Sequence, residues 1–229
     1  MELATAALLI AVPIGFNVAF FELGRTFDYP NILREPPGEV LRRFDAGGTS
    51  LLLRWQGLLT SALAMLPLVA LLAVALDADP ALTVAGVVIG SAAAVVQVLG
   101  LVRWPFAVPE LARRYVAAEG PETAATRETI EVVFATLNRL LGVGIGEHLG
   151  YLLTGLWTIV IAVAVLSTTA IWSWLGWVGF PIGAALLLGS LEFVGANEKA
   201  GWKFAGTIVP IAYVAWSVWL IALGMGLIL

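Results

Sequence analysis

Six long apolar runs, separated by polar connections of alternating length, divide the chain. Each run has about 20 residues or more, which at about 1.5 Å per residue is enough to cross a hydrocarbon core of about 30 Å. The runs cover residues 3–24, 51–76, 81–102, 143–166, 171–194 and 204–229. We therefore predict an all-α, polytopic membrane protein in which residues 1–229 form a single six-helix transmembrane domain.

The connections between the runs alternate between tight and long. Residues 77–80 and 167–170 predict tight hairpins, whereas the other three connections are longer. Apolar spacing after Pro36 and Pro37, over residues 109–118, and from Pro121 onward predicts short amphipathic helices in these longer loops. The last of them should run into the fourth membrane helix with a bend at its glycines.

All basic residues lie on one side of the predicted bilayer. The 12 Lys and Arg residues fall in or beside the first, third and fifth connections. The positive-inside rule places these loops in the cytoplasm, with both termini outside the cell (inner) membrane. Tryptophans at the predicted boundaries agree with this arrangement: Trp55, Trp104 and Trp202 at the inner one, and Trp172, Trp174 and Trp177 near the outer one.

Composition supports a membrane protein and excludes several kinds of site. Apolar residues make up 60% of the chain and charged residues 12%, against about 25% charged in an average soluble domain. The lipid bilayer is therefore the expected partner, and nucleic acid is not. The absence of cysteine excludes thiolate metal sites and iron-sulfur clusters, and a single histidine excludes bis-histidine haem. No metal site is predicted, and any cofactor is unknown.

Polar residues inside the runs gather at one level of the bilayer. Since successive helices run in opposite directions, five of them bring polar groups to the inner third, while the outer half stays apolar. This pattern predicts a polar vestibule that is open to the cytoplasm and closed outside, rather than a constitutive pore. The candidates are Asn17, Glu22, Arg54, Gln97, Glu147, His148 and Glu192.

Glu147 and His148 are the strongest candidates for chemistry. A carboxylate beside an imidazole can accept and donate a proton near neutral pH, and Tyr151 follows about one helical turn later. The alternative is that both side chains only bond to neighbouring helices. Glycines around them, spaced to allow close approach of another helix, are Gly142, Gly146 and Gly150.

The other candidates have structural alternatives. Arg54 is interpreted first as a snorkelling anchor, and Glu22 and Glu192 are interpreted first as interfacial groups. The functional alternative is that the two carboxylates form ion pairs with Arg54, Arg25 or Arg103. Asn17 and Gln97 suit interhelical hydrogen bonds as well as substrate contacts.

Three segments carry a resemblance to a known family. They are residues 27–33 after the first helix, 103–106 after the third and 146–151 in the fourth. In this order they resemble bacterial integral membrane proteins classed under a domain of unknown function (DUF4386), which implies a multi-span inner-membrane protein and no particular activity. Within these segments, Asp28 and Tyr29 could fold back over the vestibule mouth. Arg103 is either a membrane-boundary anchor or a cation for an anionic head group or substrate.

Three functions remain open from the sequence. The first is binding or transport of a small molecule or ion, with proton coupling as a variant. The second is a membrane enzyme that acts on a lipid-like substrate with Glu147 and His148 as acid and base. The third is a non-catalytic subunit or assembly factor whose glycine-rich helix faces dock onto other membrane subunits.

Overall fold

The computed structural model describes residues 1–229 and is all-helical, without strands. The α-helices are α1 (Glu2–Phe27), α2 (Pro37–Leu63), α3 (Met65–Leu76), α4 (Pro80–Leu101), α5 (Arg103–Phe106), α6 (Val108–Ala117), α7 (Ala124–Leu137), α8 (Gly150–Ser167), α9 (Trp174–Gly189) and α10 (Lys203–Gly226). A π-helical segment, η3 (Asn138–Leu149), joins α7 to α8. Short 3-10 turns occupy Asn31–Arg34, Pro121–Thr123 and Gly195–Asn197.

Five helical stretches are long and apolar enough to span a membrane. They are Glu2–Phe27, Pro37–Leu76, Pro80–Ala117, Pro121–Ser167 and Lys203–Gly226. The sixth apolar helix, α9, has 16 residues and a length of about 24 Å, less than a hydrocarbon core of about 30 Å. A helical membrane protein is therefore confirmed, and the fifth predicted run, 171–194, is helical over a shorter stretch than expected.

Two hydrogen bonds accompany the early end of α9. Ser190 donates its hydroxyl to the carbonyl of Leu187 at 2.7 Å, and the backbone N–H of Trp202 donates to the carbonyl of Glu192 at 2.7 Å. These bonds close a loop over residues 190–202 with positive φ at Gly195 and Gly201. The carbonyls that a longer helix would use thus find other partners, and Glu192 lies in this loop rather than inside a membrane helix.

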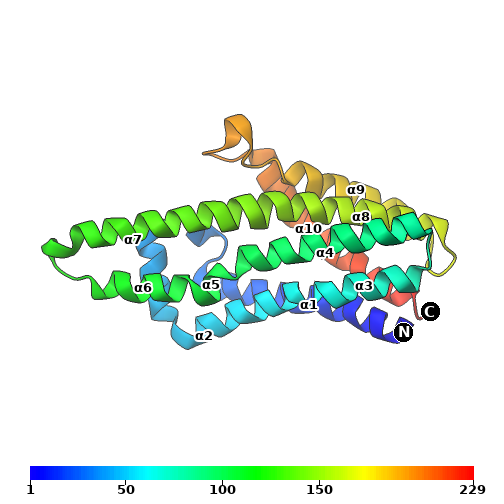
Figure 1. Cartoon of the computed structure of the whole chain (residues 1–229), viewed down its shortest axis with the longest axis horizontal. Coiled ribbons are helices and arrows are strands. Elements are labelled where there is room, and N and C mark those ends of the chain that lie inside the picture. Colours follow the sequence, from blue (N-terminus) through cyan, green and yellow to red (C-terminus); the bar gives the residue numbers. More distant parts are fainter.

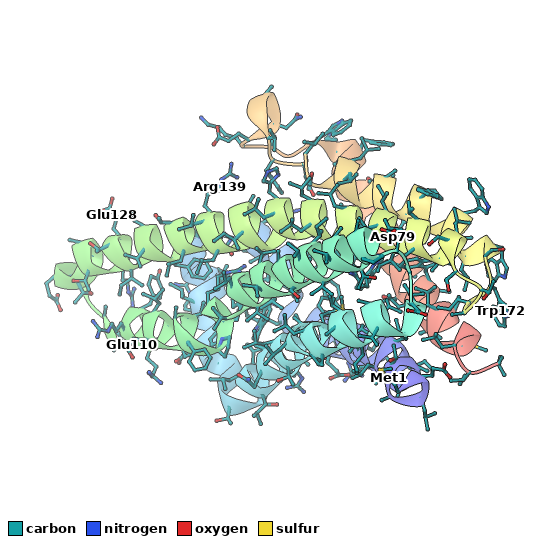
Figure 2. All side chains as sticks on the ribbon, turned by 45° about the vertical axis from the view of Figure 1, so that its right-hand side comes forward. Met1, Asp79, Glu110, Glu128, Arg139 and Trp172 are labelled. Carbon is teal, nitrogen blue, oxygen red and sulfur yellow. The ribbon has the colours of Figure 1, made fainter.

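The order of contacts between the helices is that of a closed ring. Contacts run from α1 to α2 and α3, from α3 to α4, then to α8, α9 and α10, and back to α1. Both termini lie at one end of the bundle, which we call the terminal end, and the turn between α6 and α7 lies at the other (Figure 1). Figure 2 shows the same separation, with Met1 and Trp172 toward one end and Glu110 and Glu128 toward the other.

The terminal end is closed by apolar packing. Its centre is filled by a buried core that includes Leu9, Leu68, Trp157 and Leu220, contributed by α1, α3, α8 and α10. The tight hairpin predicted at residues 77–80 is confirmed at this end. Asp77 ends α3 in the left-handed region with φ 45°, and the Asp79 carboxylate caps α4 by accepting from the N–H of Ala81 at 2.8 Å.

A second core lies at the opposite end, which we call the basic end because Arg25, Arg54, Arg103 and Arg139 lie there. Gly48, with φ 53° and ψ −151°, interrupts α2, and the part before it runs crosswise to the part after it (Figure 1). That first part buries its predicted apolar face against α6 and α7. The face consists of Val40, Leu41 and Phe44.

This second core corrects the predicted position of two tryptophans. Trp55 and Trp104 are fully buried and stack with ring centroids 4.2 Å apart and an interplanar angle of 7°. They are therefore not interfacial anchors. The helical layer of α6, α7 and the first part of α2 covers them, and a membrane-boundary prediction that ignores this layer assigns them to the lipid interface.

Candidate functional site

Glu147 and His148 lie in the π-helical segment η3, which continues directly from α7 into α8. Residues 124–167 thus form one long helix, as predicted, but η3 changes the hydrogen-bond register instead of making the expected bend. Most π-helical segments are single-turn insertions, and they are frequent at functional sites. The 12 residues of η3 form an unusually long example.

The glycines of η3 hold it against α4. A Cβ added to Gly100 would lie 2.7 Å from the Cα of Gly146, and one added to Gly146 would lie 3.3 Å from the Cα of Gly100. Gly142 faces the guanidinium of Arg103, and Gly150 faces the amide of Gln97. The predicted close approach of a helix to this glycine face is confirmed, and its partner is α4.

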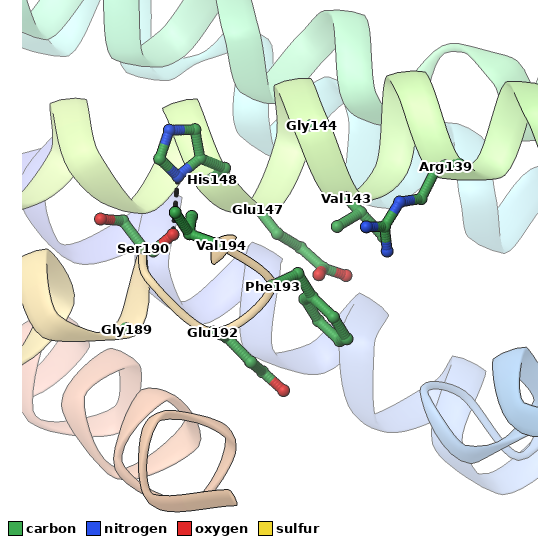
Figure 3. Close-up of a pocket in the computed structure, with 10 residues that line it drawn as sticks. All are labelled: Arg139, Val143, Gly144, Glu147, His148, Gly189, Ser190, Glu192, Phe193 and Val194. Carbon is green, nitrogen blue, oxygen red and sulfur yellow. Dashed lines mark hydrogen bonds between the residues drawn. The ribbon is translucent and has the colours of Figure 1, made fainter. Parts of the chain in front are cut away.

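Another face of η3 borders a cavity of about 170 Å³. The cavity lies between η3 and the chain that leaves α9 (Figure 3). Its polar and aromatic lining consists of Arg139, Glu147, His148, Ser190, Glu192 and Phe193. Val143 and Val194 add apolar wall. The structure therefore brings Glu147, His148 and Glu192 to one site. This agrees with the prediction that polar residues from several helices lie at the same depth in the bilayer.

Glu147 and His148 point to different parts of this cavity. His148 Nδ1 lies 2.6 Å from the carbonyl oxygen of Ser190, to which it donates, so Nε2 is the nitrogen that remains for other partners. The carboxylate of Glu147 extends instead toward Phe193 and Arg139 (Figure 3). Glu147 has no hydrogen-bond or ion-pair partner, and the two side chains do not bond to each other. The acid-base pair proposed from the sequence is therefore not assembled by direct contact.

Arg139 and Phe193 are site residues that the sequence reasoning did not select. The guanidinium of Arg139 lies 5.8 Å from the ring centroid of Phe193 and pairs with Glu198 at 3.6 Å. Arg139 precedes Glu147 by about two helical turns, so their positions on one helix face would have been a usable signal. Phe193 lies in an apolar run and carries no comparable signal.

Glu192 is the second carboxylate of the cavity. Partial burial raises the pKa of this carboxyl group above its ordinary value, and the charge of Arg34 opposes the shift. Glu192 forms no ion pair, so the alternative interpretation, in which it pairs with Arg54, Arg25 or Arg103, does not hold for this residue. The cavity thus has two carboxylates without a cationic partner.

Glu22 and Arg54 are paired with each other. Glu22 lies 3.6 Å from Arg54 and 3.8 Å from Arg25. The structure thus favours the ion-pair interpretation for Glu22, and Arg54 also donates to Ser50. These residues are separate from the cavity lining.

Asn17 and Gln97 both bond to α10. Asn17 donates to the hydroxyl of Ser217 at 2.9 Å, and Gln97 donates to the hydroxyl of Tyr213 at 2.9 Å. The ring of Tyr151 meets that of Tyr213 at 5.4 Å between centroids. Hydrogen bonds therefore join α1 and α4 to α10, with Asn17 on the exposed side, and an aromatic contact joins α8 to α10. These are the interhelical hydrogen bonds that the sequence offered as the alternative to substrate contacts.

Arg103 is buried, with a relative exposure of 5%. It donates to the carbonyl of Gly100 and to Asn138 Oδ1, the latter at 3.0 Å, and its guanidinium lies 5.2 Å from the Trp104 ring. Interpretation of Arg103 as a membrane-boundary anchor is therefore wrong, because the side chain folds inward and joins α4 to η3. Its Nε has no partner.

Tyr29 and Asp28, in the segment after α1, differ in burial. Tyr29 folds inward and its ring meets Trp55 at 4.9 Å between centroids. Burial raises the pKa of Tyr29 to about 12, with Arg103 lowering it and Glu147 raising it, so the phenol stays neutral at physiological pH. Asp28 has φ 56°, accepts from the amide of Asn31 at 3.2 Å and remains exposed. Tyr29 therefore folds over this end of the bundle and Asp28 does not.

Comparison with known proteins gives a family but no activity. No curated protein and no solved structure matches the chain. No group of three or more His, Asp or Glu residues is placed to hold a metal ion. The model of the family described as "Domain of unknown function (DUF4386)" matches residues 4–224. That match runs from α1 to α10 and covers almost the whole chain, which therefore belongs to the DUF4386 family.

Proposed function

We propose that this protein is a six-span transporter that binds a small molecule or ion in the cavity beside Glu147. In this proposal the shorter helix α9 forms the sixth span, the loop after it lies outside the membrane-spanning segments, and the basic end faces the cytoplasm. The distribution of Lys and Arg supports that orientation, since all 12 lie in segments toward the basic end.

The carboxylate of Glu147 is the observation that carries the proposal. It extends into the cavity and has neither a hydrogen-bond nor an ion-pair partner, whereas Glu22 at a similar level contacts two arginines. An ionisable group near or within the bilayer is costly unless it is paired. Binding of a ligand or a proton by the Glu147 carboxylate best explains why this carboxylate lies unpaired beside a cavity.

The asymmetry of the two ends supports transport rather than a pore. The terminal end is sealed by a buried apolar core that includes Trp157 and Trp219, while the polar groups gather toward the basic end. This arrangement corresponds to an inward-facing state, in which a solute would enter from the cytoplasm. Movement across the membrane would then require rearrangement of the apolar core, and protonation of Glu147 would provide a means of coupling.

Native mass spectrometry of protein extracted gently from its own membrane tests the proposal. We expect a non-lipid small molecule to remain bound to the wild type and to be lost in Glu147→Gln. Glu128→Gln is the matched control, because Glu128 lies on α7 toward the far end of the bundle (Figure 2) and outside the cavity lining. It should keep the ligand.

Two results would contradict the proposal. One is that the wild-type protein retains no small molecule and binds no added small molecule saturably. The other is a ligand that binds Glu147→Gln as tightly as the wild type. A wild-type protein recovered only with stoichiometric protein partners would instead support a role as a subunit of a larger membrane complex.

A further inference from the structure

The charges around the cavity point to the class of molecule that it binds. We infer that the ligand is a small organic cation with an apolar part, and that the guanidinium of Arg139 competes with it for the cavity. This inference rests on the proposed function and specifies the ligand of the same site.

The cavity lining has an excess of negative charge. Glu147 extends into it without an ion-pair partner, whereas Glu192 lines it with a carboxylate that points away from Glu147 (Figure 3). The single cationic residue of the lining, Arg139, is already paired with Glu198 at 3.6 Å. An anion would have to lie against the unpaired carboxylate of Glu147, and like charges in contact discriminate strongly against a wrong ligand. A cation would neutralise this carboxylate.

The aromatic wall of the cavity already holds a cation. The guanidinium carbon of Arg139 lies 5.8 Å from the centroid of Phe193, a distance typical of cation–π contact. Figure 3 shows the Glu147 carboxylate pointing into the same region, between Phe193 and Arg139. The ring face and the carboxylate together form a place suited to a positively charged group, and Arg139 is an internal example of such a group at that place.

The size and the rest of the lining limit the ligand further. A volume of about 170 Å³ corresponds to roughly six water molecules at about 30 Å³ each, which suits an alkylammonium group and not a large solute. Val143 and Val194 line the cavity, and Val194 is 44% exposed. They provide an apolar surface for a short hydrocarbon chain attached to the cation.

Competition with Arg139 would give ligand binding a structural consequence. Arg139 belongs to η3, whereas Phe193 and Glu198 belong to the loop after α9. These two contacts tie the long helix to that loop. A ligand cation that takes the face of Phe193 would release Arg139 and so loosen the tie, which makes the 190–202 loop the part of the structure expected to respond to binding.

Equilibrium binding to the protein in lipid nanodiscs tests the inference with two probes of equal chain length, n-butylammonium and n-butyrate, at constant ionic strength. We expect saturable binding of n-butylammonium and none of n-butyrate. Glu147→Gln should weaken n-butylammonium binding by about tenfold or more, as expected for the loss of one charge-assisted contact. Glu128→Gln should leave it unchanged.

Arg139→Gln gives the more specific result, because it should tighten n-butylammonium binding by several-fold if the arginine is a competitor. A purely structural arginine would weaken binding or leave it unchanged when removed. If Glu147→Gln does not fold, as judged by size-exclusion chromatography and near-UV circular dichroism, Glu192→Gln replaces it as the carboxylate variant. Its effect should have the same direction.

Several outcomes would overturn the inference. They are saturable binding of n-butyrate, absence of n-butylammonium binding to folded Arg139→Gln, or weaker binding to that variant than to the wild type. If native mass spectrometry finds a neutral or anionic molecule that Glu147→Gln loses, the cation inference fails and the proposed function stands. If neither probe binds and no molecule is retained, both fail.

Discussion

Replacing Gly100 with alanine would place a methyl group against the backbone of η3. The new Cβ would lie 2.7 Å from the Cα of Gly146 and 3.1 Å from the carbonyl oxygen of Leu141. Both neighbours are backbone atoms, so no flexible side chain can move aside, and α4 and η3 must separate. Overpacking of this kind costs about 1–3 kcal/mol, while alanine in place of glycine inside a helix returns about 1 kcal/mol.

Gly57→Ala isolates the packing contribution. Gly57 lies inside α2, and a Cβ added there meets nothing within 4 Å, so this variant keeps the gain in helix propensity without a clash. The free energy of unfolding should therefore be lower for Gly100→Ala than for Gly57→Ala by about 1–3 kcal/mol. Unfolding in mixed micelles with increasing dodecyl sulfate, followed by tryptophan fluorescence and far-UV circular dichroism, measures this difference. Equal unfolding midpoints for the two variants would refute the proposed backbone contact between α4 and η3.

Three further predictions concern other parts of the structure and use the same unfolding assay. Asp79→Ala removes the cap of α4 and should cost about 1 kcal/mol; no change would mean that the carboxylate does not cap the helix. Asn138→Ala leaves one donor of the buried Arg103 guanidinium without its acceptor and should cost about 1–3 kcal/mol, whereas Asn138→Asp should not. Glu192→Gln should become increasingly more stable than the wild type as the pH rises from about 4.5, because a carboxyl group with a raised folded-state pKa opposes folding once it ionises. A stability difference that stays constant with pH would contradict the burial of Glu192.

The sequence predicted the membrane helices and the clustering of polar residues well, because both depend on properties that are local or follow from topology. Long apolar runs define helices whatever their neighbours are. Alternating helix direction then placed Glu147, His148 and Glu192 at one level, and the structure brings all three to one cavity. The glycine pattern around Glu147 likewise predicted that another helix would approach closely, although it did not identify α4.

The failures concern contacts between distant segments. Trp104 and Arg103 follow a membrane helix and have the composition of a membrane boundary, but they are buried, and α7 and the first part of α2, which are distant in sequence, belong to the layer that covers them. The end of α9 depends on a hydrogen bond between Glu192 and Trp202 across the loop, which no local pattern indicates. The sequence also did not indicate which residues would line the cavity together with Glu147. Arg139 and Phe193 became recognisable only when the long helix and the loop after α9 lay side by side.

The π-helical segment also constrains how this chain can change during evolution. Before it, Ile130 and Phe134 of α7 enter the core at the basic end, and after it, Trp157 and Ile161 of α8 enter the core at the terminal end. Deleting one residue from 138–149 would rotate one half of the long helix relative to the other. Either core would then receive the wrong side chains. Insertions and deletions should therefore be rare within η3. They should be tolerated in the loop between α6 and α7, where they would not rotate α7 relative to α8.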